Sequence, residues 1–355
     1  MATLMQASHQ WATRPADERF TSLLDMQDHF RNQRRLSGEK VVSSRKLIAT
    51  PTEDNKGLLV NGYAPTNWSF GQLAQLAEAP AGYLRTLPSP VAADCINYGL
   101  QFKRNIEDVG VLLYKNGDSV LKAATGPRYG RIWNDDIVRS LVNQFGDGVT
   151  GNFRVPGEFG KAVEVTKENT TLFAGDRDMF VFLADEQHRI ELPNRRNGET
   201  GSLARGFFFW NSEVGSQTFG MASFLFDYVC CNRIVWGAKE FQEVRIRHTA
   251  SAPDKWIHEV APALEAYSRS STGSVIAAIE DARKDKLGDD VNNWLAQRFG
   301  KRMVDSLQAT HYSEEQRPIE TRWDVITAVT AQARNIQHQD SRVELERQAG
   351  ALLQD

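Results

Sequence analysis

The pattern of apolar and polar positions predicts strands in the middle of the chain and helices at its end. Between residues 41 and 250, short apolar or alternating runs recur, as expected for β-strands. They cover residues 41–48, 58–63, 162–166, 179–183, 189–192, 206–210, 218–226 and 244–247. From Lys255 onward, apolar residues repeat with helical spacing and without a strand pattern. The helices predicted there cover residues 256–282, 290–299, 319–336 and 343–353.

The first part of the chain predicts helices with recognisable ends. Within residues 10–36, Pro15 and the two acidic residues that follow it are typical of the first turn of a helix. Arg34 and Arg35 lie at its predicted C-terminus, where positive charge interacts favourably with the helix dipole. Thr66 is a suitable N-cap for a second helix, which Pro80 stops. A further short helix is predicted to begin near Pro88.

The clearest local signal is a hairpin. Two β-rich runs flank Asn116 and Gly117, a pair suited to the positive φ angles of a type I′ turn, so residues 109–124 are predicted to form two antiparallel strands. An amphipathic helix is predicted at residues 135–145.

These elements define an α+β fold class. Adjacent strand runs favour a largely antiparallel sheet core with flanking helices and a helical C-terminal region, rather than a doubly wound sheet. We divide the chain into an N-terminal helical segment (1–36), a mixed α+β core (37–250) and a helical C-terminal region (251–355).

Composition and charge indicate which partners and which cellular location to expect. With 42 Lys+Arg against 45 Asp+Glu, the net charge is −3, which argues against wholesale non-specific binding of nucleic acid but permits a segregated basic patch. Three cysteines, two of them adjacent, fit a reducing cytoplasm. The start of the chain lacks the features of a signal peptide, and the most apolar run, residues 219–229, is broken by Asp227. We therefore expect a cytoplasmic protein with no membrane contact.

Motifs for common catalytic sites are absent from the sequence. Gly160-Lys161 and Gly300-Lys301 lack the rest of a phosphate-binding loop, no GxGxxG follows a strand, and the seven histidines show no zinc-ligand spacing. We expect no cofactor and no metal site built from local sequence. Carboxylates that a metal-dependent nuclease would need bracket the strand at 179–183, where exposed strand-end charges are the simpler interpretation. These are Asp176, Asp178, Asp185 and Glu186.

A serine nucleophile has equally weak support. Ser212 follows a strand but lacks the preceding glycine of a nucleophile elbow. Asn211, Ser212 and Glu213 are better interpreted as a turn in which side chains hydrogen-bond the local backbone. The sequence therefore favours a protein that is not an enzyme.

Basic residues with aromatic neighbours are the remaining chemical signal. Arginines that follow phosphates, beside aromatic rings that stack on bases, make a groove for single-stranded nucleic acid. A solvated sheet face with its aromatic residues in the core is the alternative. The candidate nucleic-acid-binding residues are Arg128, Arg131, Arg205, Trp210, Lys239, Arg245 and Arg247.

Two stretches resemble a known family. Residues 124–141 ("ATGPRYGRIWNDDIVRSL") and 205–237 ("RGFFFWNSEVGSQTFGMASFLFDYVCCNRIVWG"), followed by "RIRHT" at 245–249, resemble the phage/plasmid-like proteins of domain-of-unknown-function family 932. The resemblance implies residence on phages, plasmids or other mobile elements, and it implies no catalytic residues.

Three functions remain open. The first is non-enzymatic binding of single-stranded DNA by a homo-oligomer, as in strand annealing during recombination. The second is a regulatory or anti-defence inhibitor that binds a host protein. The third and weakest is a metal-dependent nuclease that uses Asp176, Asp178 and Glu186.

Overall fold

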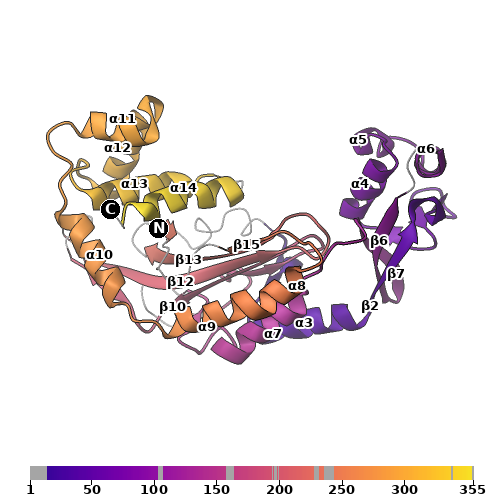
Figure 1. The fold of residues 1–355 in the computed structure, drawn as a ribbon, viewed down its shortest axis with the longest axis horizontal. Coiled ribbons are helices and arrows are strands. Elements are labelled where there is room, and N and C mark those ends of the chain that lie inside the picture. Colours follow the sequence, from indigo (N-terminus) through magenta and orange to yellow (C-terminus); the bar gives the residue numbers. More distant parts are fainter. Residues whose placement is uncertain are drawn as a thin grey trace.

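A large antiparallel sheet forms the centre of the molecule (Figure 1). The structure is a computed structural model that describes residues 14–102, 107–156, 164–193, 195, 198, 200–227, 232–235, 244–336 and 339–353. Within these ranges nine strands join, all in antiparallel pairs, in the order β1-β9-β10-β12-β13-β14, with β8, β11 and β15 paired to β10, β12 and β13. The bounds are β1 Arg19–Phe20, β8 Phe153–Arg154, β9 Leu172–Ala174, β10 Met179–Asp185, β11 Ile190–Leu192, β12 Gly201–Asn211, β13 Phe219–Asp227, β14 Asn232–Val235 and β15 Val244–Ile246.

Both faces of the long strands β10, β12 and β13 are buried, which explains why their sequences are nearly continuous apolar runs. Because side chains alternate along a strand, Val181 and Phe209 lie in one core while Phe182 and Phe208 lie in another. The first face is covered by α3 (Leu23–Arg35), α7 (Asn134–Phe145) and α9 (Ala261–Arg269), which run along it in Figure 1. The second face carries stacked rings, with Phe182 and Phe224 4.5 Å apart.

A second sheet stands apart from the first at one end of the molecule (Figure 1). It has the strand order β2-β6-β7-β5, and a two-stranded sheet, β3-β4, lies beside it. Three helices complete a lobe whose core is separate from that of the large sheet. The bounds are β2 Ser37–Ser43, β3 Ala49–Pro51, β4 Leu58–Val60, β5 Ala64–Pro65, β6 Asp108–Asn116, β7 Asp118–Thr125, α4 Asn67–Leu76, α5 Ala81–Leu84 and α6 Ser89–Phe102.

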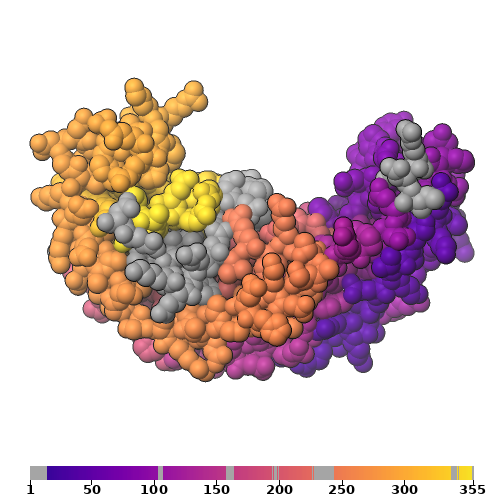
Figure 2. All heavy atoms as spheres, in the orientation of Figure 1, coloured from indigo at the N-terminus to yellow at the C-terminus, as the bar shows by residue number. Residues whose placement is uncertain are grey.

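The C-terminal helices pack against the far end of the large sheet. They are α10 Gly273–Lys284, α11 Val291–Phe299, α12 Lys301–Glu315, α13 Arg322–Ala333 and α14 Gln339–Ala351. Every residue of α13 except Gln332 is buried, so this helix lies at the centre of the group. Leu192, Leu203 and Leu225 of the sheet share its core. In the space-filling view the molecule is curved, with the lobe of residues 37–125 at one end and these helices at the other (Figure 2).

The predicted α+β class, with a largely antiparallel sheet and C-terminal helices, is confirmed. Within the interval 37–250, the large sheet and the lobe that contains the two smaller sheets have different cores, and the boundaries of the predicted domains stay a prediction. Thr66 caps α4 as expected, since its hydroxyl accepts a hydrogen bond from the Ser69 amide.

Several boundaries differ from those predicted. The helix expected to begin at Pro15 begins only at Leu23, where Ser22 caps it, because the preceding residues form a 3₁₀ turn (Ala16–Glu18) and β1. The helix expected at 256–282 is divided into a π-helix (Trp256–Val260), α9 and α10, and a short helix, α8 (Ala252–Lys255), precedes it. Residues 164–166 lie outside any strand. The 109–124 hairpin is present, but of its two turn residues only Gly117 has a positive φ, 77°, so the turn is not type I′.

None of the helices in the described ranges is both long and apolar enough to cross a lipid bilayer.

Candidate nucleic-acid interface

Two segments far apart in the sequence meet beside the large sheet. The Gly130 amide donates to the His248 carbonyl at 3.1 Å, and His248 Nδ1 donates to the Gly130 carbonyl at 3.0 Å. The rings of Tyr129 and His248 stack with centroids 4.8 Å apart. Gly130 is required here because a Cβ at this position would lie 1.8 Å from the Thr249 carbonyl oxygen. The backbone contact therefore fixes the 126–131 segment on the end of β15.

Three of the expected arginines lie around this contact. Arg128 and Arg247 directly precede the stacked Tyr129 and His248, and both are exposed. Neither forms an ion pair with a carboxylate in the described part of the chain. Arg245, also exposed, is on β15 with its guanidinium carbon 5.9 Å from the Trp210 ring centroid. We call Arg128, Arg245 and Arg247 the arginine surface.

Arg131 lies beneath this surface and not on it. Its side chain is 4% exposed, and its Nε donates to Glu39 Oε1 on β2 at 2.6 Å. Its guanidinium also lies over the rings of Tyr129 and Trp133, at 5.2 and 5.6 Å. The expected phosphate contact by Arg131 is therefore corrected: this guanidinium joins the small lobe to the 126–131 segment.

Arg205 is also buried, and its guanidinium binds other groups of the protein. It is buried on β12, where its Nε lies 3.3 Å from Asp185 Oδ2. Its other nitrogens donate to the carbonyls of Ser268 and Ser270, at 3.1 and 2.5 Å. A cation is favourable at this point because the C-terminal carbonyls of α9 carry partial negative charge. Arg205 therefore anchors α9 to the sheet, and no part of it is placed for phosphate.

Trp210 has no exposed face on which a base can stack. It is 1% exposed and packs on Phe208, with centroids 5.5 Å apart. Its ring fills the space over Gly220, where a Cβ would lie 1.9 Å from the indole. The expectation of base stacking by Trp210 is corrected on this ground. Lys239 and the cysteine pair Cys230 and Cys231 lie outside the described residues.

A buried polar network connects the "NSE" turn at residues 211–213 to the segment that begins with Tyr129. The side-chain amide of Asn211 donates to the Ile132 carbonyl at 2.8 Å. The Glu213 carboxylate accepts a hydrogen bond of 2.7 Å from the backbone amide of Asn134, in the first turn of α7. The Tyr129 hydroxyl donates to the Ser212 carbonyl at 2.7 Å. Burial raises the pKa of Glu213. The network holds residues 126–134 against the turn after β12.

Ser212 forms the expected turn. Its hydroxyl oxygen accepts hydrogen bonds from the Val214 and Ser216 amides, at 3.2 and 2.9 Å, and its hydroxyl donates to the Arg177 carbonyl at 2.7 Å. These bonds stabilise the 212–216 turn beside Tyr129, and the hydroxyl is buried away from any substrate.

The carboxylates considered for a nuclease bind basic side chains instead of one another. Asp178 forms an ion pair of 2.7 Å with Arg14, Asp185 pairs with Arg205, and Glu186 pairs with Arg189. They also lie at opposite ends of β10. Within the described ranges, no three His, Cys, Asp or Glu side chains are grouped as a metal site requires.

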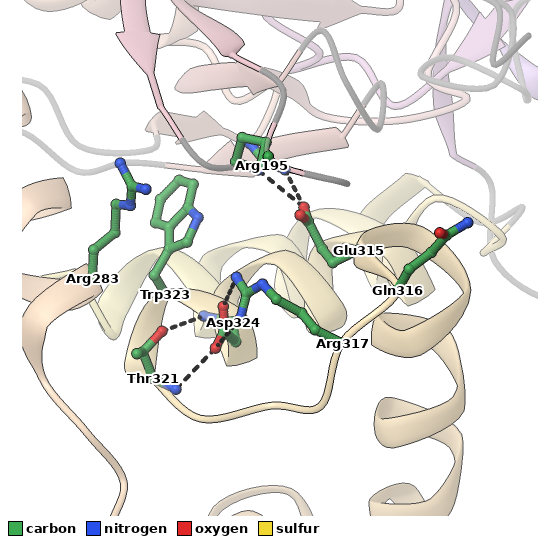
Figure 3. Close-up of a pocket in the computed structure, with 9 residues that line it drawn as sticks. Arg195, Arg283, Glu315, Gln316, Arg317, Thr321, Trp323 and Asp324 are labelled. Atoms are coloured by element: carbon green, nitrogen blue, oxygen red, sulfur yellow. Dashed lines mark hydrogen bonds and ion pairs between the residues drawn. The ribbon is translucent and has the colours of Figure 1, made fainter.

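A cavity between the sheet and the C-terminal helices is the feature that we did not expect from the sequence (Figure 3). Arg195 of the segment after β11, Arg283 of α10 and Arg317 between α12 and α13 line it together. No local motif marks these residues, because they come from three separate elements.

The chain belongs to the family described as Domain of unknown function (DUF932), whose model matches residues 159–352, more than half of the chain. The match contains Arg245, Arg247 and the cavity residues, whereas Arg128 and the 124–141 block precede it. We found no match to the chain among curated proteins or among solved structures.

Proposed function

We propose that this protein binds single-stranded DNA without catalysing a reaction, and that it does so through the arginine surface. The observation that carries the proposal is the exposure of Arg128 and Arg247 side by side with the Tyr129–His248 stack, without a carboxylate partner in the described ranges. Guanidinium groups bind phosphate oxygens strongly, and such contacts supply most of the affinity for nucleic acid without sequence preference.

The size of this surface suggests assembly. Arg128 and Arg247 can neutralise only a few phosphates, so one chain would hold a short stretch of strand. A homo-oligomer would repeat the surface along the strand and keep it extended, as strand annealing in recombination requires. We extend the proposal to that role and to residence on a phage or plasmid in a bacterial cytoplasm, on the resemblance described above.

Fluorescence anisotropy with a labelled mixed-sequence 40-nucleotide oligomer at low salt tests the proposal. We expect saturable binding by the native chain. Charge reversal in Arg128→Glu/Arg247→Glu should weaken it at least about tenfold, which corresponds to about 1.4 kcal/mol. The matched control is Arg302→Glu on α12, because Arg302 is exposed and likewise has no carboxylate partner among the described residues. Absence of binding by the native chain, or equal losses in both variants, would contradict the proposal.

One observation favours a second function, binding of a host protein. Tyr98 and Phe102 on α6 are 69% and 71% exposed, with their rings 5.0 Å apart. Paired exposed aromatic residues are common in protein interfaces. If a stoichiometric host protein co-purifies with the native chain and is lost from Tyr98→Ser/Phe102→Ser but retained by Arg128→Glu/Arg247→Glu, this second function replaces the first.

A further inference from the structure

The cavity beside α13 has a volume of about 470 Å³, within the range of pockets that hold small molecules (Figure 3). Its walls come from the segment after β11, the end of α10, the end of α12 and the first turn of α13. The lining residues that matter for binding are Arg195, Arg283, Glu315, Arg317, Trp323 and Asp324.

Two of its three guanidiniums are neutralised by carboxylates. Arg195, 3% exposed, lies 2.8 Å from Asp227 on β13 and donates from Nε to Glu315 at 3.0 Å. Arg317 donates to both oxygens of Asp324, at 2.9 and 2.5 Å. The same carboxylate accepts from the Thr321 amide and completes the cap of α13. These pairs join the sheet to the helices and fix the cavity walls.

Arg283 differs from the other two. It donates to the Pro193 carbonyl, and it forms no ion pair with a carboxylate in the described part of the chain. Burial lowers the pKa of Arg283, and the charges of Arg195 and Arg317 lower it further, whereas the carboxylates of Glu315 and Asp324 act in the opposite direction. An anion beside Arg283 would give this guanidinium the direct partner of opposite charge that it lacks among the described residues.

Trp323 carries a buried hydrogen-bond donor, its indole nitrogen, that has no acceptor among the described residues. The residue is 1% exposed, and its ring lines the cavity. In Figure 3 the ring stands between Arg283 and Glu315. A buried donor without an acceptor is unfavourable, so a ligand oxygen that accepts a hydrogen bond from this nitrogen would be stabilising.

We propose that this cavity binds a small oxyanion ligand, whose phosphate or carboxylate group pairs with Arg283 and which offers a further oxygen to the Trp323 indole nitrogen. A guanidinium matches either group through two parallel hydrogen bonds. The volume of the cavity suits a small molecule. The site is separate from the arginine surface, and the proposal does not depend on DNA binding.

Isothermal titration of the full chain with inorganic phosphate, adenosine monophosphate and succinate, each at matched ionic strength, tests the site and separates phosphate from carboxylate ligands. We expect at least one probe to bind saturably, with its Kd raised at least tenfold in Arg283→Gln. Lys284→Gln is the matched control, because Lys284 follows Arg283 on α10, is 75% exposed and does not line the cavity. The arginine-surface variant Arg128→Glu/Arg247→Glu should bind the probe as the native chain does.

A second measurement on the native chain guards against unfolding of the variant. The ¹⁵N-indole resonance of Trp323, assigned by its absence from Trp323→Phe, should shift as the probe saturates. Failure of all three probes to bind at concentrations up to about 10 mM, tenfold above a Kd of about 1 mM, would overturn the proposal. Binding that leaves both the Trp323 resonance and the Arg283→Gln affinity unchanged would overturn it equally.

Discussion

Gly130 and His248 bind each other through two hydrogen bonds, although 118 positions separate them in the sequence. This contact brings the segment before α7 to the end of β15, and with it Arg128 to the neighbourhood of Arg247. The exposed arginines are thus brought together by a backbone contact that requires glycine, and by a histidine that is held neutral.

The Gly130 contact gives the first prediction. Gly130→Ala should lower the free energy of unfolding by about 1–3 kcal/mol or more, because the new Cβ would meet the Thr249 carbonyl at 1.8 Å and force the segments apart. The same variant should weaken DNA binding. Gly126→Ala is the control, since a Cβ there has no atom within 4 Å. Equal stability of the two variants in urea unfolding would show that the contact is dispensable.

Acid sensitivity is the second prediction. Burial, together with the smaller effect of the Arg131 charge, lowers the pKa of His248 to about 4, although its hydrogen bond to the Gly130 carbonyl acts in the opposite direction. The unfolded chain therefore takes up a proton that the folded chain does not, so this group removes stability as the pH falls from about 6.5 to about 4.

Urea unfolding at several pH values within this window measures the effect. Its upper limit is about 3 kcal/mol, because each unit of pKa difference corresponds to about 1.36 kcal/mol. His248→Asn retains a side-chain donor for the Gly130 carbonyl but cannot titrate, so it should lose less stability on acidification. Parallel losses in both proteins would refute the assignment to His248.

The third prediction separates Arg205 from the arginine surface. Arg205→Ala should lower the free energy of unfolding by about 3–5 kcal/mol, because it leaves Asp185 buried without this partner and removes the contacts to the end of α9. Arg128→Ala should change stability by less than about 0.5 kcal/mol, since this side chain is exposed. Thermal or urea unfolding compares the two. A mild effect of Arg205→Ala would return Arg205 to the candidate DNA contacts.

Salt dependence gives the fourth prediction. Each phosphate contact with a single strand contributes about −0.7 to the slope of log K against log salt. Arg247→Ala should therefore make the slope shallower by about 0.7 per chain, and Arg302→Ala should leave it unchanged. Anisotropy titrations at four salt concentrations measure the slopes. An unaltered slope in Arg247→Ala would place the phosphate contacts elsewhere.

Local sequence patterns were sufficient where neighbours along the chain decide the structure. The cap at Thr66, the hairpin around Gly117 and the turn at Ser212 each depend on residues only a few positions apart, and all three are present. Patterns predicted the ends of elements less reliably. Helix α3 starts at Leu23 because the preceding residues form β1, which pairs with β9, a strand far away in the sequence.

The sequence by itself determined the α+β class, the antiparallel sheet and the presence of exposed basic residues, because apolar periodicity and charge are properties of the chain. Only the tertiary structure decided which arginines are exposed and which are buried in contact with a carboxylate. Arg131 and Arg205 look like Arg128 and Arg247 in the sequence, but the first two are buried against Glu39 and Asp185. Burial and ion pairing depend on which distant segments pack together. The same reason explains why the cavity of Arg195, Arg283 and Arg317 appears only in the folded chain.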